Sequence, residues 1–235
     1  MEAHGRIAKI YVKWANISPF LSSASLDRTK DAEDITTLSK DSKKYMPGQK
    51  DAVFSGDGIY NGDKDKIDKL AHEINTGKPI YSYYPFSDDA GSKGYAFKAL
   101  QSASNISNSI TGAASFSLGG QTSEGVHRVT SIIPLTEFDD NESSDGVDLG
   151  SAGADGAIVF IHVTGVTDKA DIVIEHSDDD GVGDAYSAWT SLVDTDTVDG
   201  YIIDSDTAIK QWVRVTIANM IALETIEVQV GIKKH

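Results

Sequence analysis

Apolar residues alternate with polar ones over much of this chain, and that period of two limits the possible folds more than any other feature. In residues 6–14, "RIAKIYVKW", the side chains of Ala8, Ile10, Val12 and Trp14 fall on one face of an extended chain. A β-strand repeats every two residues, whereas a helix repeats about every 3.6. The sequence therefore predicts a mainly β protein whose strands have one well-buried face.

The second half of the chain consists almost entirely of such runs. After residue 156 the candidate strands are "AIVFIHVTGV", "ADIVIEHS", "AWTSLV", "GYIID", "KQWVRVTIAN" and "TIEVQVGIKK", and Val147 and Leu149 suggest a shorter one before them. Short strands separated by polar turns predict a β-sandwich of immunoglobulin-like or jelly-roll-like type. The run 157–163 is apolar on both faces and is expected to be a central, covered strand. Trp189 and Trp212 are assigned to the core.

The first half adds strands and one helix. The strands are expected at 25–29, from residue 52, and at 79–86, 94–105 and 109–120. Between them, residues 63–76 place Ile67, Leu70, Ala71 and Ile74 at helical spacing, which predicts an amphipathic helix that packs on a sheet. Asn61 or Asp63 can cap its start, and Gly77 with Pro79 ends it.

Charge divides the chain near residue 128. Residues 1–128 hold 16 Lys and Arg against 15 Asp and Glu, and residues 129–235 hold 5 against 21, so the net charges are +1 and −16. This break predicts two domains, 1–128 with much of its surface against other protein and 129–235 with a solvated acidic surface. The acidity of the second opposes tight binding to nucleic acid or to an anionic membrane. A simply soluble acidic module is the alternative.

Several classes of protein are not expected. Cysteine is absent, which excludes disulfides and thiolate chemistry. The N-terminal residues lack the apolar core of a signal peptide, and no apolar stretch is long enough for a transmembrane helix, so synthesis inside a cell and no membrane insertion are expected. The six histidines have no metal-ligand spacing, and neither a nucleophile elbow nor a phosphate-binding loop is present. The chain is therefore expected to be no enzyme and to need no cofactor.

The turn "SDDDGVGDAYSAW", residues 177–189, is the one weak metal candidate. Asp178, Asp180 and Asp184 resemble a calcium loop in composition, but the helices and the final glutamate of an EF-hand are missing. A polar hairpin turn is the simpler interpretation, because Asp-Gly between strands is a turn signal. No metal site is therefore assigned.

The stretch 34–62 is unusually polar and partly basic for this chain. Its central segment, 38–51, is interpreted as a long loop, because Pro47, Gly48 and many charged residues interrupt the strand pattern. Its lysines alternate with acids and have no aromatic stacking platform beside them, which makes specific nucleic-acid binding a poor interpretation.

The order of motifs from residue 16 onward resembles the N-terminal signature of tail tube (major tail) proteins of long-tailed bacteriophages. The matching pieces are "NISPFL" (16–21), "DAEDITT" (31–37), "KKYMPGQKD" (43–51) and the spaced glycines Gly56 and Gly58. The resemblance covers about residues 6–128, and the family's helix and its closing pair of long strands correspond to 63–76 and 94–120. Residues 39–41 depart from the family, whose members often carry glycine or small residues there.

The resemblance implies a tail-tube-type β-barrel or sandwich with one packed helix, assembled as hexameric rings that stack into a tube for DNA. It implies further partners, which are the tape-measure protein, tail terminator and baseplate proteins, and DNA that passes without sequence-specific binding. It also implies a location in the virion tail after synthesis in the host cytoplasm. The loop would then contact the adjacent subunit or ring through Ser39, Lys40, Asp41, Lys43, Lys44, Tyr45, Pro47, Gly48, Lys50 and Asp51.

The acidic residues 129–235 resemble accessory β-sandwich domains of phage structural proteins and are expected on the tube exterior, which favours a non-contractile tail. Three alternatives remain open at this point. The chain could be a virion decoration or adhesin that binds host-surface carbohydrate, or an enzyme such as a glycosidase. The 38–51 loop could also be mobile and make no contact.

Overall fold

The computed structural model describes residues 7–37, 42–60, 67–73, 77–107, 114–220 and 224–235. The chain forms two compact units from interleaved segments. Unit 1 comprises residues 1–19, 79–96 and 127–235, and unit 2 comprises 20–78 and 97–126. The division into domains 1–128 and 129–235 stays a prediction about which segments fold on their own.

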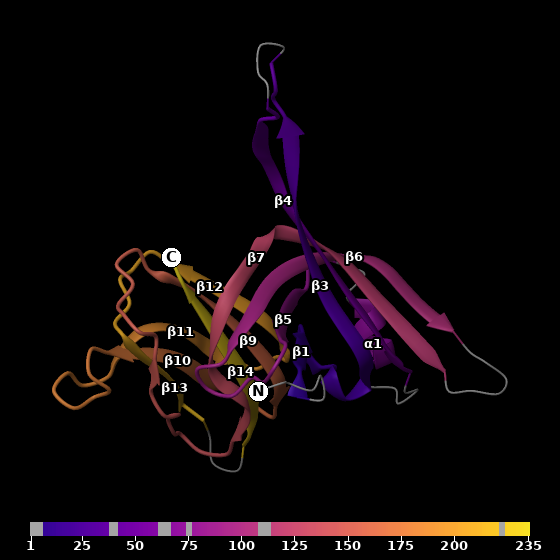
Figure 1. The fold of residues 1–235 in the computed structure, drawn as a ribbon. Coiled ribbons are helices and arrows are strands. Elements are labelled where there is room, and N and C mark those ends of the chain that lie inside the picture. The colour runs from indigo at the N-terminus through magenta and orange to yellow at the C-terminus, as the bar shows by residue number, and fades with distance from the viewer. Residues whose placement is uncertain (1–6, 38–41, 61–66, 74–76, 108–113, 221–223) are drawn as a thin grey trace. The chain divides into compact units, whose positions relative to one another are not determined.

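Most strands belong to unit 1, and the described strands pair with one another in antiparallel fashion. They are β1 (Lys9–Val12), β2 (Ala15–Asn16), β5 (Ile80–Tyr84), β8 (Val147–Asp148), β9 (Ala157–Val166), β10 (Ala170–Ser177), β11 (Ser187–Thr195), β12 (Asp199–Ser205), β13 (Trp212–Ala218) and β14 (Ile226–Lys234), with parts of β6 (Lys93–Ser107) and β7 (Ser115–Phe138). One sheet runs in the order β12-β9-β14-β7-β6-β5-β1-β2, and a second runs β11-β10-β13-β8 (Figure 1). The chain is thus mainly β, as predicted.

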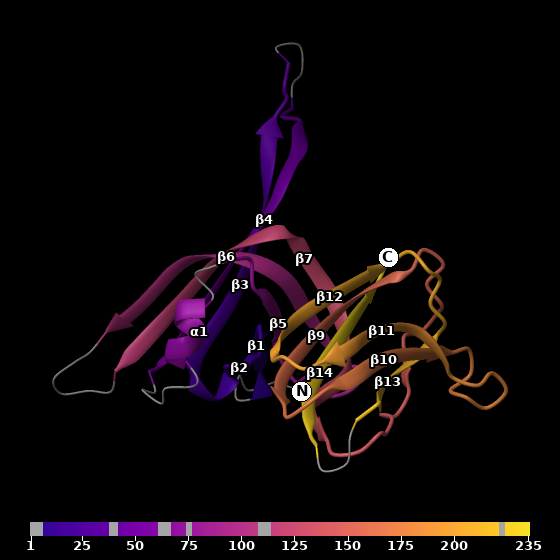
Figure 2. The ribbon, with the colours of Figure 1, turned by 180° about the vertical axis from the view of Figure 1, so that it is seen from behind.

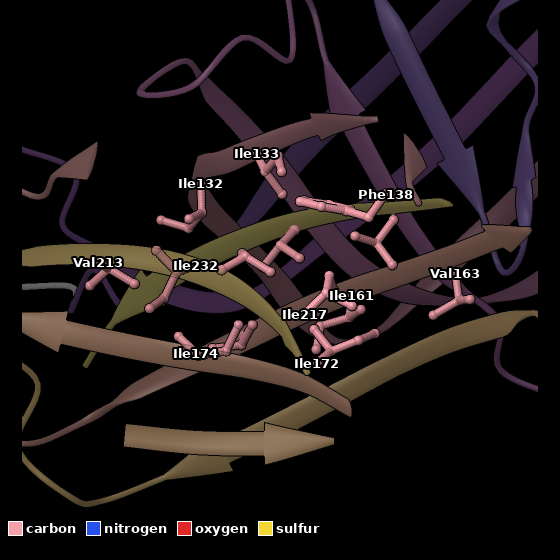
Figure 3. Close-up of a cluster of buried hydrophobic side chains, with 14 of the residues drawn as sticks. Ile132, Ile133, Phe138, Ile161, Val163, Ile172, Ile174, Val213, Ile217 and Ile232 are labelled. Atoms are coloured by element: carbon pink, nitrogen blue, oxygen red, sulfur yellow. The ribbon is translucent and has the colours of Figure 1, made fainter. Parts of the chain in front are cut away.

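A large apolar core lies between the two sheets of unit 1 (Figure 3). Alternate residues of β10 and β13 contribute to it, because every second side chain of a strand points to the same face. The principal side chains are Ile132, Phe138, Val159, Ile161, Val163, Ile172, Ile174, Val213, Val215, Ile217, Val228, Val230 and Ile232. This arrangement is a β-sandwich, and its assignment to the immunoglobulin-like or jelly-roll-like type remains a prediction.

Strand β9 is buried on both faces. Its residues 157–163 are all buried, and it lies between β12 and β14. Val159 and Ile161 face the sandwich core, whereas Ile158 and Phe160 join a second cluster with residues such as Tyr84. The prediction of a central covered strand is confirmed.

The two tryptophans differ in their surroundings. Trp189 packs against the sandwich core, and its indole nitrogen donates to the carbonyl oxygen of Thr207 at 2.9 Å. Trp212 is half-buried on the opposite side of β13 from Val213 and Val215, which are fully buried. The assignment of Trp212 to the core was wrong, because the period of two in β13 places the smaller β-branched residues inward.

Unit 2 is built on β3 (Leu21–Asp34), β4 (Tyr45–Ile59), helix α1 (Ile67–Glu73) and the remaining parts of β6 and β7. A 3-10 turn, Ser18–Phe20, precedes β3. Strand β4 pairs with β3 on one side and with β7 on the other. Phe54 and Phe97 are fully buried with their ring centroids 6.0 Å apart, and they form part of the apolar interior of this unit.

Helix α1 falls within the predicted range 63–76. Of the four residues expected to pack, Leu70 is buried. The side chains of Ile67 and Ala71, and the whole of Ile74, lie outside the described part of the structure. Packing of the complete apolar stripe therefore stays a prediction.

Candidate assembly interface

The hairpin β3–β4 extends past the rest of unit 2 as a two-stranded ribbon (Figures 1 and 2). Strand β4 pairs with β7 only from Val53 to Ile59. Beyond that point, β4 residues 45–52 pair with β3 residues 28–34 and with no other described strand. We call the described residues 27–37 and 42–52 the arm.

The arm corrects the interpretation of residues 38–51 as a loop. Residues 45–51 lie in β4 and pair with β3, from Tyr45 opposite Asp34 to Asp51 opposite Thr29. Pro47 and Gly48 suggested a loop because both weaken a strand. Proline is nevertheless tolerated on an edge strand, where its missing N–H interrupts no ladder, and among the described strands β4 has no second partner at this position.

A β-bulge accommodates Pro47 and Gly48. The pairing passes from Lys30 opposite Lys50 to Ala32 opposite Pro47, so two residues of β4 lie opposite one residue of β3. A Cβ atom at position 48 would lie 2.8 Å from the Cβ of Asp31, closer than real Cβ atoms approach. Glycine is therefore required by the close approach of the two backbones.

Hydrogen bonds join the two strands of the arm at residues 34–36 and 44. The Asp34 carboxylate accepts the backbone N–H of Thr36 at 2.9 Å, and the Thr36 hydroxyl oxygen accepts the N–H of Lys44 at 2.8 Å. The N–H of Ile35 donates to the carbonyl of Lys44 at 2.8 Å, and the Lys43 ammonium lies 3.9 Å from Asp34. The side-chain and backbone hydrogen bonds from Thr36 hold the pKa of Asp34 below its usual range. The "DITT" part of the quoted pattern therefore has a structural role.

Of the loop residues named from the sequence, Ser39, Lys40 and Asp41 lie outside the described residues. Lys43 and Lys44 are exposed and directly precede β4, and that strand contains Tyr45, Pro47, Gly48, Lys50 and Asp51. The structure thus gathers the described members of the set on one ribbon. Their role in contacts between subunits stays a prediction.

The arm also exposes large apolar side chains. Tyr45 is 54% exposed, Met46 49% and Ile35 39%, and Val53, at the base of the arm, is 39% exposed. Sequence reasoning missed Ile35, Met46 and Val53. For Val53 the signal was available, because it alternates with the buried residues Ala52 and Phe54.

The spaced glycines of the quoted pattern lie at the base of the arm. A Cβ at Gly58 would overlap the carbonyl oxygen of Phe20 and come 2.7 Å from the ring of Phe116. A Cβ at Gly56 would come 3.2 Å from Leu21. The glycines therefore let β4 pass close to the start of β3, where Leu21 pairs with Gly58.

The carboxylates in the acidic turn of residues 177–186 contact other groups of the same chain. The Asp184 carboxylate contacts the Lys210 ammonium at 2.5 Å and accepts the N–H of Asp178 at 2.8 Å, while Asp180 accepts the hydroxyl proton of Tyr186 at 2.6 Å. Within the described residues, no group of three acids or histidines is arranged to hold a metal ion. The calcium hypothesis thus gains no support and remains untested.

Comparisons with known proteins give matches in structure only. No family model and no curated protein matches the sequence. Solved structures that the chain resembles include a protein of the virion of a native gene transfer agent particle, at 16% identity and a TM-score of 0.46, over 53% of this chain and 97% of that one. The SPP1 tail tube protein matches at 12% identity and a TM-score of 0.44, over 56% of this chain and 81% of that one. The SPP1 Dit protein, described as a hub adsorption apparatus component, matches at 10% identity and a TM-score of 0.36, over 97% of this chain and 99% of that one.

The tail of a gene transfer agent particle and the SPP1 tail tube are thus among the structures to which the chain is similar. TM-scores below 0.5 carry no functional conclusion by themselves. No membrane-spanning helix is found among the described residues.

Proposed function

We propose that the chain is a structural protein of a phage-type tail that assembles with copies of itself into hexameric rings stacked as a tube. The tube would serve as the conduit for DNA, and residues 129–235 would decorate its exterior. The proposal rests on the order of sequence motifs in residues 16–58 together with the physical properties of the arm. Contacts with a tape-measure protein, a terminator or a baseplate remain predictions from the resemblance.

The arm is the observation that carries the proposal. A two-stranded hairpin without further support is at best marginally stable in water. The outer edge of β3 and the edge of β4 over residues 45–52 have no partner strand among the described residues. Unpaired edges and exposed apolar side chains are both liabilities in a monomer, and both are removed when another subunit covers them.

The charges on the arm support a specific contact with another subunit. Lys30, Lys50 and Asp51 are exposed on it, and positively and negatively charged residues are interspersed along residues 27–34 and 43–51. Mixed charges of this kind select a register and a partner more than they add affinity. If the charges on the arm were all positive, the favoured partner would instead be a polyanion, and if they were all negative, it would be a cation.

The carbohydrate-binding alternative finds less support. A sugar-binding surface usually needs exposed aromatic rings, and Trp189 has its N–H bonded to Thr207 and its ring against the sandwich core. Among the described residues of unit 1, Phe86 is the one exposed aromatic side chain.

Negative-stain electron microscopy of the purified protein over a concentration series tests the proposal. Wild-type protein is expected to form six-fold rings or tubes. A variant with Tyr45→Ser and Met46→Ser is expected to remain as separate subunits, because burying a side chain of this size contributes about 1.5–3 kcal/mol to a contact. A variant with Val182→Ser and Val193→Ser is the matched control, because both valines are exposed apolar residues of unit 1, remote from the arm in sequence.

Uniform small particles of the wild type at every concentration would contradict self-assembly and favour a decoration module. Equal assembly of the arm variant and the control would contradict the role of the arm while leaving a tail protein possible. Circular dichroism of each variant establishes that the fold is retained.

A further inference from the structure

Unit 1 contains a pocket of about 250 Å³ with an unusual concentration of positive charge. Lys93 from β6, Arg128 from β7, and Lys233 and Lys234 from β14 line it. The last two are 2 of the 5 Lys and Arg in residues 129–235, a segment that also holds 21 Asp and Glu. Half of the cluster thus comes from a strongly acidic segment, and this concentration of positive charge calls for a physical explanation.

The strand register brings three of these cations together. Thr130 on β7 pairs with Ile232 on β14, and the Lys93 ammonium donates to the Thr130 hydroxyl at 2.6 Å. Arg128 precedes Thr130 by two residues and Lys234 follows Ile232 by two, so in antiparallel strands they are neighbours on the same face. Ile232 itself is buried in the sandwich core (Figure 3) and also lines the pocket, so the cations lie next to that core.

The described residues provide no acid that pairs with these cations. No ion pair joins Lys93, Arg128, Lys233 or Lys234 to a described carboxylate within 4.0 Å. The Asp148 carboxylate accepts hydrogen bonds from Gly150 and Gln211. These bonds lower the pKa of Asp148, and the charge of Lys234 lowers it further. Like charges on neighbouring strands destabilise a sheet, so the cluster is a cost to the isolated protein.

The N–H groups of these cations differ in how many hydrogen bonds they already make within the protein. The Lys234 ammonium already donates to the carbonyl oxygens of Leu149 and Ser151 at 3.0 and 2.7 Å, so it contributes mainly charge. The Lys93 ammonium makes one hydrogen bond with the described residues, and the Arg128 guanidinium makes none with them. Partial burial, with the charges of Arg128 and Lys234, lowers the pKa of Lys93. Lys93 and Arg128 therefore have N–H groups left for a ligand, in a positive field that Lys234 strengthens.

We propose that this pocket binds a phosphate group. A guanidinium presents two parallel N–H groups that match two oxygens of one phosphate, and an ammonium can take a third oxygen. The negative charge of phosphate would balance the three clustered cations better than the single charge of a carboxylate. The Thr130 hydroxyl, which accepts from Lys93, can donate its own proton to the same ligand.

Two sources of the group are compatible with the pocket: a terminal phosphate, free or in a monoester, and a phosphodiester within a chain. The pocket is independent of the proposed assembly, because none of its residues belongs to the arm. The two proposals can therefore fail separately.

Isothermal titration calorimetry of the full chain with sodium phosphate, at ionic strength matched with sodium chloride, tests the proposal. Wild-type protein is expected to bind phosphate, and Arg128→Gln or Lys93→Gln is expected to weaken binding by about tenfold, since each removes a charge-assisted hydrogen bond. Lys169→Gln is the matched control, because it removes the same charge from a surface lysine near Asp194 and is expected to leave binding unchanged. Circular dichroism confirms that the variants are folded.

Glycerol 3-phosphate and a dinucleotide then distinguish the two sources. Tighter binding of the monoester assigns the pocket to terminal phosphate, and tighter binding of the dinucleotide assigns it to a phosphodiester. No heat of binding with phosphate, equal binding of acetate, or equal weakening by Lys169→Gln and Arg128→Gln would each overturn the proposal.

Discussion

The imidazole of His162 lies in the interior of unit 1 with both ring nitrogens bonded. Nδ1 lies 2.7 Å from the carbonyl oxygen of Lys13, and Nε2 lies 2.8 Å from the hydroxyl oxygen of Ser82. A carbonyl oxygen only accepts, so Nδ1 carries the proton, and Nε2 accepts the hydroxyl proton of Ser82. The neutral ring therefore satisfies every polar atom, and burial lowers the pKa of His162 from 6.5 to about 4.

Replacement of His162 by Gln is expected to flatten the dependence of stability on pH. Between about pH 6.5 and pH 4 the unfolded state binds a proton at this residue and the folded state does not, so wild-type stability falls as pH falls through this window and is fully present above it. The depressed pKa corresponds to about 3 kcal/mol, at roughly 1.4 kcal/mol per pKa unit. Urea unfolding at several pH values measures the slope.

His72→Gln serves as the control for that experiment, because His72 is an exposed histidine on helix α1. Its variant should keep the wild-type slope. Identical slopes for His162→Gln and wild type between pH 4 and pH 6.5 would show that the ring of His162 titrates normally.

The case of His162 also shows what the sequence could predict at the scale of a residue. Its burial followed from its position in the apolar run 157–163, which is covered on both faces. Its partners did not follow, because Lys13 and Ser82 are 149 and 80 residues away along the chain. A periodic pattern fixes which face a side chain occupies and says nothing about which distant strand lies against that face.

At the scale of elements, the sequence predicted strands well where polar and apolar residues alternate regularly. The prediction failed in β4, a paired strand that contains proline and glycine. Strands β9, β10 and β14 lie where their patterns placed them. The distal part of β4 was missed, because Pro47 and Gly48 are strand breakers unless a bulge and a free edge accommodate them. Both conditions depend on tertiary structure, so local propensity could not have given the arm.

Hydrogen exchange should divide β4 into two parts. Residues 53–58 pair with both β3 and β7, and Ile59 pairs with β7, whereas residues 45–52 pair with β3 alone among the described strands. In the unassembled chain, peptides from 45–52 are therefore expected to exchange faster than peptides from 53–59, because they open without breaking a second ladder. Mass spectrometry of the exchanged protein measures this difference.

Peptides from β9, which is covered on both faces, provide the slow-exchanging reference. Assembly should slow exchange in 45–52 and leave β9 unchanged. Slow exchange of 45–52 in separate subunits would mean that the arm is stabilised without a partner, and the main support for the proposed assembly would be lost.

At the scale of the whole chain, the uneven charge is the dominant property. The net charge of −15 arises almost wholly from residues 129–235, while residues 1–128 are near neutral. Copies that assemble through the arm would therefore bring their acidic segments together. The interaction between exposed charges decays over about 10 Å at 0.1 M salt, so this repulsion is strongest in dilute buffer.

Self-assembly is accordingly expected to increase with sodium chloride between about 0.05 M and about 0.5 M, because screening reduces the repulsion between acidic segments. Apolar contacts made by Tyr45 and Met46 would persist at both salt concentrations, since burial of apolar surface does not depend on Coulomb attraction. Sedimentation velocity at constant protein concentration measures the fraction in rings or larger species. The Tyr45→Ser, Met46→Ser variant should stay unassembled at both salt concentrations, which separates assembly through the arm from salt-induced aggregation. A decrease of assembly with salt in the wild type would show instead that ion pairs between the Lys and Asp residues of neighbouring arms outweigh the repulsion, and the arm contact would then be electrostatic rather than apolar.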